Sequence, residues 1–202
     1  MDLLARLELA FVVWHVFAGF LGTSLVYRLR FGAFPHARWR RPRASRHRRI
    51  QAAMGVVSLA WASAVVAHFT SPAFGASPLG RPLVAPPAAV GWAIAVVGHL
   101  GMVGSQLAMG RALRVGLEET GPLAPVDLVT RGPFARSRHP VYVSSIVFLL
   151  GEWLWNPSLA CALCVLLLVA GFHQLAAEED RSLAARFGAA HEEYRRHVRR
   201  YL

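Results

Sequence analysis

The stretch Leu128–Tyr142, with the sequence LVTRGPFARSRHPVY, gathers glycine, proline, arginine and histidine between two long apolar segments. Proline lacks a backbone N–H and disfavours the helical conformation for the residue before it. The pairs Gly132-Pro133 and His139-Pro140 therefore interrupt any helix through this stretch. We expect a bent loop that carries its arginines and His139 to the edge of an apolar layer.

The chain's run of three acidic residues, Glu178-Glu179-Asp180, stands at the end of the last apolar segment. If the apolar residues between the loop and this run fold as a helical hairpin, the two polar ends meet. We expect the functional site at that meeting point.

The composition is typical of a membrane protein. Hydrophobic residues make up 55% of the 202, all 22 basic residues are arginine, and no acidic residue occurs between Glu8 and Glu118. Uncharged stretches near or above the ~18 residues that mark a membrane span recur along the chain. The net charge of +11 lies in loops between these stretches, and no basic groove interleaved with aromatic residues accompanies it. We expect a lipid bilayer as partner, and no nucleic acid.

We predict an all-α polytopic membrane protein with about five transmembrane helices. The predicted spans are Leu9–Tyr27, Ile50–Phe69, Ala88–Met109, Val141–Trp155 and Ser158–Ala177. The first is too long for the apolar region of a signal peptide, so we interpret it as a retained span. The fourth, at ~22 Å as a helix, falls short of the ~30 Å of bilayer hydrocarbon.

The loops predict the orientation of these spans. The segment Arg28–Arg49 holds nine arginines and no acidic residue, which favours the cytoplasmic side. The weakly charged segment Thr70–Pro87 suits the opposite side. Five spans then place the N-terminus outside and the C-terminus inside.

The tail is predicted to be an amphipathic helix on the inner membrane surface, where it would cover the loop. Its apolar residues recur at steps of three and four, and they are Leu183, Phe187, Ala190, Tyr194, Val198 and Tyr201.

Two further groups lie inside the predicted spans. Cys161 and Cys164 have CxxC spacing but no partner cysteines or nearby histidine pair, so we interpret them as buried apolar residues and predict no metal site. Ionisable groups in a membrane are functional candidates, yet a neutral histidine is cheaper to bury than a charge. Both interpretations stay open for His15, His68, His99 and His173.

The motif RHPxY followed by acidic residues favours a zwitterionic ligand. Arginine, histidine and tyrosine offer donors to a carboxylate, and an acidic side chain offers a counter-charge to an amine. S-adenosylmethionine is such a ligand. The alternative is that Arg138 reaches to lipid phosphates and Glu179 pairs with a surface arginine.

The pattern TRGPF…RHPVY, then EED…L…FG…Y, resembles the membrane methyltransferase family that contains isoprenylcysteine carboxyl methyltransferase and phospholipid N-methyltransferases. The likeness runs from about Gln106 to the C-terminus, and MGRALRVGLEE resembles the MGRxWRxG segment of bacterial members. The resemblance implies that S-adenosylmethionine binds at the last two spans and their flanking loops. We divide the chain into a two-span region, residues 1–87, with an arginine-rich cytoplasmic loop, and a catalytic core, residues 88–202.

The resemblance also implies roles for individual residues. Arg138 and His139 are the catalytic candidates. Asp180 replaces a second glutamate of the family, and His191 replaces a tyrosine. The implied cofactor-binding residues are Val126, Asp127, Leu128, Val129, Phe134, His139, Pro140, Val141, Tyr142 and Glu179.

The implied substrate-binding positions are His173 and Leu175. The isoprenylcysteine enzymes place a substrate-binding arginine where this chain has Leu175, four residues before Glu179. An unpaired carboxylate there would cost several kcal/mol of desolvation. This argues against a prenylcysteine carboxylate and favours a neutral or weakly basic acceptor.

Together these features predict an integral membrane methyltransferase that uses S-adenosylmethionine, with its active site facing the cytoplasm. The acceptor is a lipophilic or small molecule with a thiol, amine or carboxyl group. For an amine or thiol, a base such as His139 or His173 could help to remove the proton. The alternative is a non-catalytic membrane scaffold that kept the fold.

Overall fold

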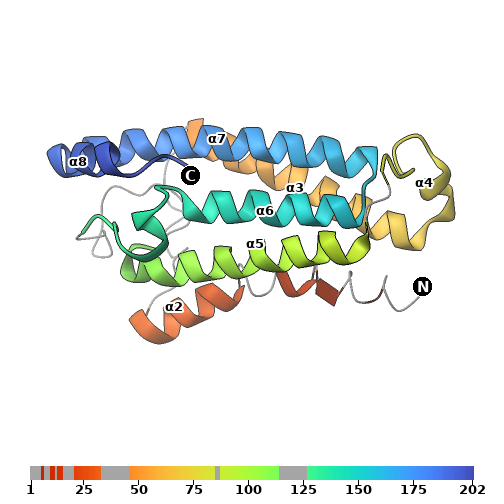
Figure 1. Ribbon diagram of the computed structural model, residues 1–202, viewed down its shortest axis with the longest axis horizontal. Helices are drawn as coiled ribbons and strands as arrows, with labels where there is room; N and C mark the ends of the chain where they lie inside the picture. The colour runs from red at the N-terminus through yellow and green to blue at the C-terminus, as the bar shows by residue number, and fades with distance from the viewer. Residues whose placement is uncertain are drawn as a thin grey trace.

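The computed structural model describes residues 6, 10–11, 13–15, 21–32, 46–84, 87–113 and 127–202. In these residues the chain is a bundle of helices without a β-strand (Figure 1), which confirms the all-α prediction. The elements in chain order are α2 (Thr23–Phe31), α3 (Arg46–Thr70), α4 (Pro72–Ala76), α5 (Ala88–Met109), η2 (Gly110–Ala112), η3 (Gly132–Ala135), α6 (Pro140–Trp155), α7 (Leu159–Phe187) and α8 (Ala189–His197).

Three helices of the described chain are long and apolar enough to cross a membrane: residues 49–70 of α3, 89–109 of α5 and 159–187 in α7. They match the second, third and fifth predicted spans. The fourth, α6, is apolar but has only 16 residues. Within the first predicted span, Leu9–Tyr27, residues 9, 12 and 16–20 lie outside the described residues, so five spans are not confirmed.

Helices α5 and α6 pack with their backbones in contact, because glycines line the surface between them. A Cβ atom on Gly98 would collide with the backbone of Phe148, and one on Gly151 would collide with the backbone of Ala95. At Gly91 the added atom would stand 2.6 Å from the backbone nitrogen of Trp155. Small residues allow such close approach between membrane helices. The contact fixes α6, and with it the loop that precedes it.

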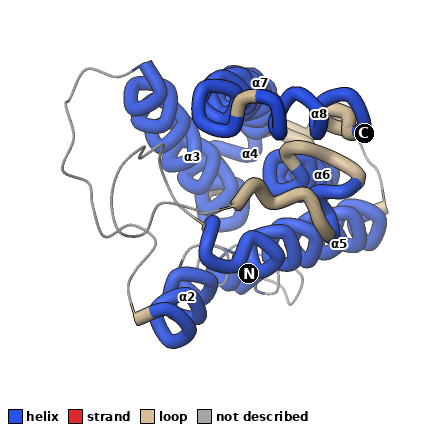
Figure 2. Tube along the Cα trace, turned by 90° about the vertical axis from the view of Figure 1, so that its left-hand side faces the viewer, coloured by secondary structure: helices blue, strands red, loops and turns tan. Residues whose placement is uncertain are grey.

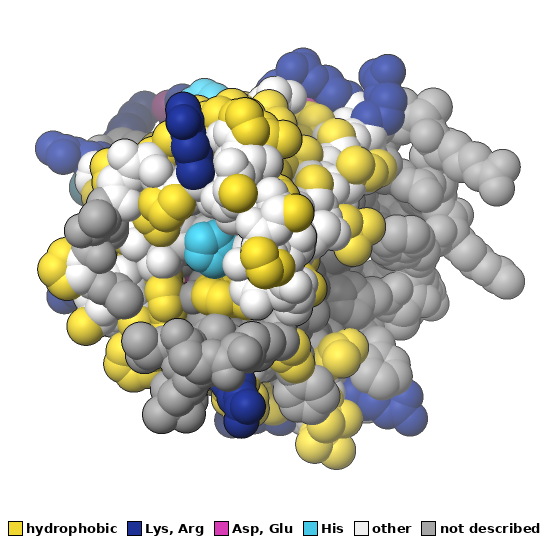
Figure 3. All heavy atoms as spheres, turned by 90° about the vertical axis from the view of Figure 1, so that its right-hand side faces the viewer, with side chains coloured by type: hydrophobic (Ala, Val, Ile, Leu, Met, Phe, Trp, Pro, Cys, Tyr) yellow, Lys and Arg dark blue, Asp and Glu magenta, His cyan; other side chains and the backbone are white. Residues whose placement is uncertain are grey.

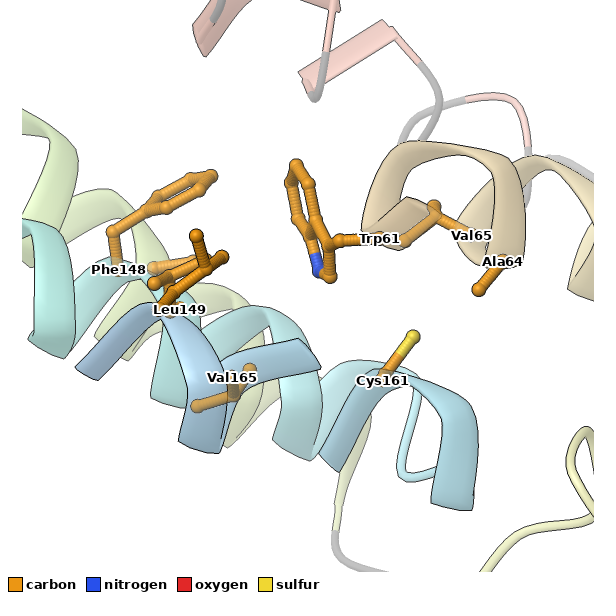
Figure 4. Close-up of a cluster of buried hydrophobic side chains, with 9 residues drawn as sticks. Trp61, Ala64, Val65, Phe148, Leu149, Cys161 and Val165 are labelled. Atoms are coloured by element: carbon orange, nitrogen blue, oxygen red, sulfur yellow. The ribbon is translucent and has the colours of Figure 1, made fainter. Parts of the chain in front are cut away.

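A buried apolar cluster joins this pair to α3 and α7 (Figure 4). Seen from the end of the bundle, α6 lies between α5 and α7, and α3 lies beside α7 (Figure 2). Cys161 belongs to the cluster and is fully buried, as the sequence predicted, while Cys164 packs against it. The other buried members are Trp61, Ala64, Val65, Ala95, Phe148, Leu149, Val165 and Leu168.

The turn between α6 and α7 forms at Asn156-Pro157. Ser158 caps α7 by accepting a hydrogen bond from the Cys161 amide at 3.3 Å. The amide of Leu83 donates to the Pro157 carbonyl at 2.7 Å, which ties the segment after α4 to this turn. Figure 3 shows this end of the bundle, where hydrophobic side chains spread over the described surface.

The tail differs from the single amphipathic helix that the sequence predicted. Helix α7 continues through the acidic residues to Phe187, and Gly188 ends it with φ 51°. Helix α8 then covers only Ala189–His197, and Val198 is already extended. Glycine adopts positive φ without the steric cost that other residues meet, so it breaks the helix despite the continuous apolar stripe.

We predict that Gly98→Ala will destabilise the protein by about 1–3 kcal/mol, since the added methyl group overlaps backbone that no rotamer change can move. Gly104→Ala, in the same helix, is the matched control because its Cβ atom would meet nothing within 4 Å. Unfolding of the purified protein by titration with sodium dodecyl sulfate measures both. Equal stability of the two variants would contradict the close packing of α5 and α6.

Candidate functional site

The hairpin of α6 and α7 brings the loop and the acidic residues together, as predicted. Helix α6 begins at Pro140, directly after His139, and α7 returns antiparallel to it (Figure 1). The loop itself is bent, with one 3₁₀ turn at Gly132–Ala135 that starts at a glycine with φ 63°. Residues about forty positions apart thus form one polar cluster.

His139 lies between the two carboxylates of this cluster. Its Nε2 is 3.1 Å from Oδ1 of Asp180, and its Nδ1 is 3.4 Å from Oε2 of Glu179. Its ring stacks on that of Tyr142, with centroids 5.7 Å apart. Burial lowers the pKa of His139, but hydrogen bonds to Asp180 and Glu179 outweigh it, so the pKa lies above its ordinary 6.5. The cluster therefore favours the charged imidazolium.

Asp180 makes more contacts than any prediction gave it. Its Oδ1 accepts a hydrogen bond of 2.9 Å from Nη1 of Arg138, and its Oδ2 accepts one of 2.9 Å from Nε of Arg200. The side chains of Asp180 and Arg138 are only 8% and 9% exposed. Asp180 therefore joins the loop, α7 and the C-terminal segment. The sequence placed Asp180 as a substituted glutamate and did not single out Arg200.

Glu179 faces a different direction from its neighbour, because successive helical residues are about 100° apart. Its Oε1 accepts a short hydrogen bond from the Tyr142 hydroxyl. The Tyr142 ring also stacks on Phe172, with centroids 5.3 Å apart. At 32% exposure, the Glu179 side chain is held in place yet open to a ligand.

The C-terminal segment covers the loop, as predicted for the tail. The amide of Arg138 donates to the Arg199 carbonyl at 3.0 Å. The Ser137 hydroxyl donates to the Arg200 carbonyl at 3.2 Å. The Tyr194 hydroxyl donates to the Phe134 carbonyl at 2.6 Å, and burial raises the pKa of Tyr194 to about 12.

His191 is fully buried under the same cover. Its Nε2 is 3.9 Å from Oδ1 of Asp180. Burial lowers the pKa of His191, so it is neutral at pH 7.

The remaining predicted residues vary in exposure. Val126 lies outside the described residues, Asp127 is exposed, and Leu128 and Val129 are half-buried at the start of the loop. Phe134 and Pro140 are buried and Val141 is half-buried.

The two predicted substrate-binding residues differ in their exposure to solvent. The side chain of Leu175 is only 5% exposed. His173 is exposed, and its Nδ1 forms a 2.8 Å hydrogen bond with the Tyr201 hydroxyl.

Helix α3 adds basic residues that the sequence argument did not consider. Nε of Arg46 lies 3.3 Å from Oε1 of Glu178, next to Glu179. His47 is buried beside it, and neither of its ring nitrogens has a hydrogen-bond partner among the described residues. Helix α3 thus brings guanidinium groups to the end of the bundle that holds the acidic residues of α7, so the absence of an arginine at Leu175 does not leave this end without positive charge.

The intramembrane histidines do not form part of this cluster. Nδ1 of His15 is 2.7 Å from Nδ1 of His99, so one ring donates to the other. Within the part of the chain that the structure describes, no group of three or more metal-ligating side chains could hold an ion.

We predict that Asp180→Asn will destabilise the protein by about 3–5 kcal/mol, because it leaves the buried Arg138 guanidinium without its counter-charge. Glu193→Gln is the control, since the Glu193 side chain is 60% exposed and pairs only with neighbours on α8. Thermal unfolding in detergent micelles compares the two. A loss no larger for Asp180→Asn than for the control would show that this ion pair does not hold the site together.

Comparison with known proteins agrees with this arrangement. The model of the phospholipid methyltransferase family matches residues 88–190, a region that contains α5, α6, α7 and the acidic residues. No curated protein and no solved structure matches the chain. Arg200 and α3 lie outside the matched region. Since the match spans half of the chain, the protein belongs to the phospholipid methyltransferase family of membrane enzymes.

Proposed function

We propose that the protein is an S-adenosylmethionine-dependent methyltransferase whose active site is the cluster around His139. The observation that carries this proposal is the joining of Arg138, His139 and Tyr142 to two adjacent carboxylates of α7. A scaffold that only needed to keep its helices together would not require a half-exposed carboxylate oriented by two side chains.

The residues present fit a zwitterionic cofactor. The open carboxylate of Glu179 suits the amino group. For the carboxylate of the ligand, the first turn of α6 offers backbone N–H groups without intrahelical acceptors, at the positive end of the helix dipole. Nε of Arg138 is a further buried donor with no partner among the described residues. When bound, the cofactor supplies a methyl group attached to a sulfonium. The sulfonium sulfur is a good leaving group because it departs as a neutral thioether.

The side chains of the cluster have two further roles, which are to orient Glu179 and to exclude water. Tyr142 and His139 hold Glu179 in position by hydrogen bonds. Because both ring nitrogens of His139 face carboxylates, we assign it to orientation rather than to proton removal. Arg138, Asp180 and Arg200 lock the loop beneath the C-terminal segment, which excludes water from the reacting groups.

We propose further that this end of the bundle faces the cytoplasm, where the soluble cofactor is available. The acceptor is a lipophilic or small molecule with a thiol, amine or carboxyl group, and it reaches the site laterally from the bilayer. Methyl transfer from labelled cofactor into a lipid extract, a panel of thiols and prenylcysteine analogues tests the activity. A protein that neither binds the cofactor nor methylates any of these would be the scaffold of the alternative hypothesis.

We predict that Glu179→Gln will lower the affinity for S-adenosylmethionine by about ten- to a hundredfold, the ~1.5–3 kcal/mol of a charge-assisted hydrogen bond. The substitution keeps the shape of the side chain and removes its charge. Calorimetry in detergent measures the affinity, with Glu193→Gln on α8 as the control. Unchanged affinity in Glu179→Gln would exclude this residue from the cofactor site.

The orientation predicts opposite labelling of two engineered cysteines, in a background where Cys161 and Cys164 are alanine. Cysteine at the exposed Ala73, in α4, should react with an impermeant maleimide in intact cells. Cysteine at the exposed Glu193, in α8, should react only after the membrane is opened. The reverse pattern would place the acidic cluster on the outer face.

A further inference from the structure

A thiol or amine acceptor carries a proton that must leave when the methyl group arrives, and the side chains of the polar cluster are already engaged. Both ring nitrogens of His139 face carboxylates. Asp180 accepts hydrogen bonds from two arginines, and His191 is fully buried. Glu179 accepts a hydrogen bond from Tyr142 and is assigned to the amino group of the cofactor. The group that takes the proton therefore comes from beside this cluster.

His173 combines exposure with a hydrogen bond to a hydroxyl group. It lies on α7, six residues before Glu179, or ~9 Å along the helix axis. Its Nδ1 shares a 2.8 Å hydrogen bond with the Tyr201 hydroxyl, and its side chain is exposed. Helix α7 is long and apolar enough to cross a membrane, and an ionisable group in such a helix is a functional candidate. A lipophilic acceptor that arrives through the bilayer can reach this imidazole.

Tyr201 links His173 to the polar cluster. The ring centroid of Tyr201 is 6.0 Å from that of His173 and 6.5 Å from that of His139. The His139 ring stacks in turn on Tyr142, which holds Glu179. Tyr201 is thus in ring contact both with the histidine that orients Glu179 and with the exposed histidine. A proton taken up at the Tyr201 oxygen has a direct path to the ring of His173.

The two residues before Tyr201 fix its position. The carbonyl of Arg199 accepts a 3.0 Å hydrogen bond from the amide of Arg138, and that of Arg200 accepts a 3.2 Å hydrogen bond from the hydroxyl of Ser137. Burial raises the pKa of Tyr201, against the opposing charge of Arg200, so the hydroxyl keeps its proton at pH 7. Tyr201 is therefore suited to pass a proton on, and the imidazole of His173 is suited to receive it.

We propose that Tyr201 and His173 take the proton of the methyl acceptor, and that the acceptor is a lipophilic thiol or amine rather than a carboxylate. The proton of the nucleophile passes to the Tyr201 oxygen while the hydroxyl proton of Tyr201 passes to Nδ1 of His173. The electron pair of the nucleophile forms the bond to the methyl carbon. The carbon–sulfur bond breaks, and its electrons stay on the departing thioether. The imidazolium of His173 then releases its proton to solvent.

This proposal rests on the proposed methyltransferase function and adds to it the chemical class of the acceptor. It also assigns a role to Tyr201, which lies outside residues 88–190, the part that the family model matches.

Methylation of four probes by the full-length protein in detergent tests the pair. Dodecanethiol and dodecylamine carry a proton on the nucleophile at pH 7, whereas para-nitrothiophenol and dodecanoate are anions without one. The wild type should methylate a proton-bearing probe and para-nitrothiophenol, but not dodecanoate. Tyr201→Phe keeps the ring and removes the hydroxyl, and His173→Gln removes the imidazole. Each should lower kcat for the proton-bearing probe about a hundredfold, as expected for loss of a general base. Each should keep the wild-type rate with para-nitrothiophenol, which has no proton to lose.

The matched control is His197→Gln, because the His197 side chain is 71% exposed on α8 and bonds to Glu193 of the same helix. It should keep the wild-type rate with every probe. An equal loss with both kinds of probe in Tyr201→Phe and His173→Gln would assign the pair to positioning and overturn the proposal. Unchanged rates with the proton-bearing probe, or a wild type that methylates only dodecanoate or none of the four, would also overturn it. A melting temperature for each variant separates lost catalysis from lost folding.

Calorimetry with S-adenosylmethionine on the same preparations distinguishes this failure from that of the proposed function. We expect Tyr201→Phe and His173→Gln to bind the cofactor as the wild type does. Cofactor binding, with methylation that does not depend on the pair, would reject the pair alone. A wild type that neither binds the cofactor nor methylates any probe would reject the methyltransferase, and the pair with it.

Discussion

The buried carboxylate of Asp180 is the constraint on which the candidate site depends. It accepts hydrogen bonds from Arg138, in the loop before α6, and from Arg200, in the segment after α8. Removing charges from water costs several kcal/mol per ion, which only well-placed partners offset. The two carboxylates, of Asp180 and Glu179, stand among three cations, which are Arg138, Arg200 and the imidazolium of His139. The carboxylate of a bound ligand would offset the remaining positive charge of the cluster.

Adjacent acidic residues serve two purposes here because of helix geometry. A step of about 100° between Glu179 and Asp180 turns one carboxylate toward the opening and the other toward the loop. Asp180 is 6% exposed and holds chain segments together, whereas the Glu179 side chain is 32% exposed and is held by Tyr142 and His139. The contacts of Asp180 therefore hold in place the chain segments that surround Glu179. Close packing of α5 against α6 adds rigidity, since glycine backbones in contact leave little room for sliding.

The sequence predicted those features that depend on local chemistry. The pair His139-Pro140 predicted where α6 begins, and uncharged runs predicted α3, α5 and α6 near their observed bounds, whereas α7 continues to Phe187 beyond the predicted Ala177. The meeting of His139 with the acidic residues followed from the hairpin alone. The break at Gly188 was missed because the apolar stripe continues across it, and a stripe does not report backbone conformation. The role of Arg200 was missed because its contact with Asp180 depends on how the chain turns after the break at Gly188.

The arginines show why composition alone could not tell which basic residues orient the chain in the membrane and which build the candidate site. The positive-inside rule accounts for basic loops without any specific partner, so from the sequence most arginines are interpreted as an orientation signal. Yet Arg138 is buried against Asp180, and Arg46 contacts Glu178. If the cofactor site faces the cytoplasm, the residues that orient the chain and those that build the site gather at the same end. Burial and the identity of the partner then distinguish a structural arginine from a solvated one, and both are properties of the fold.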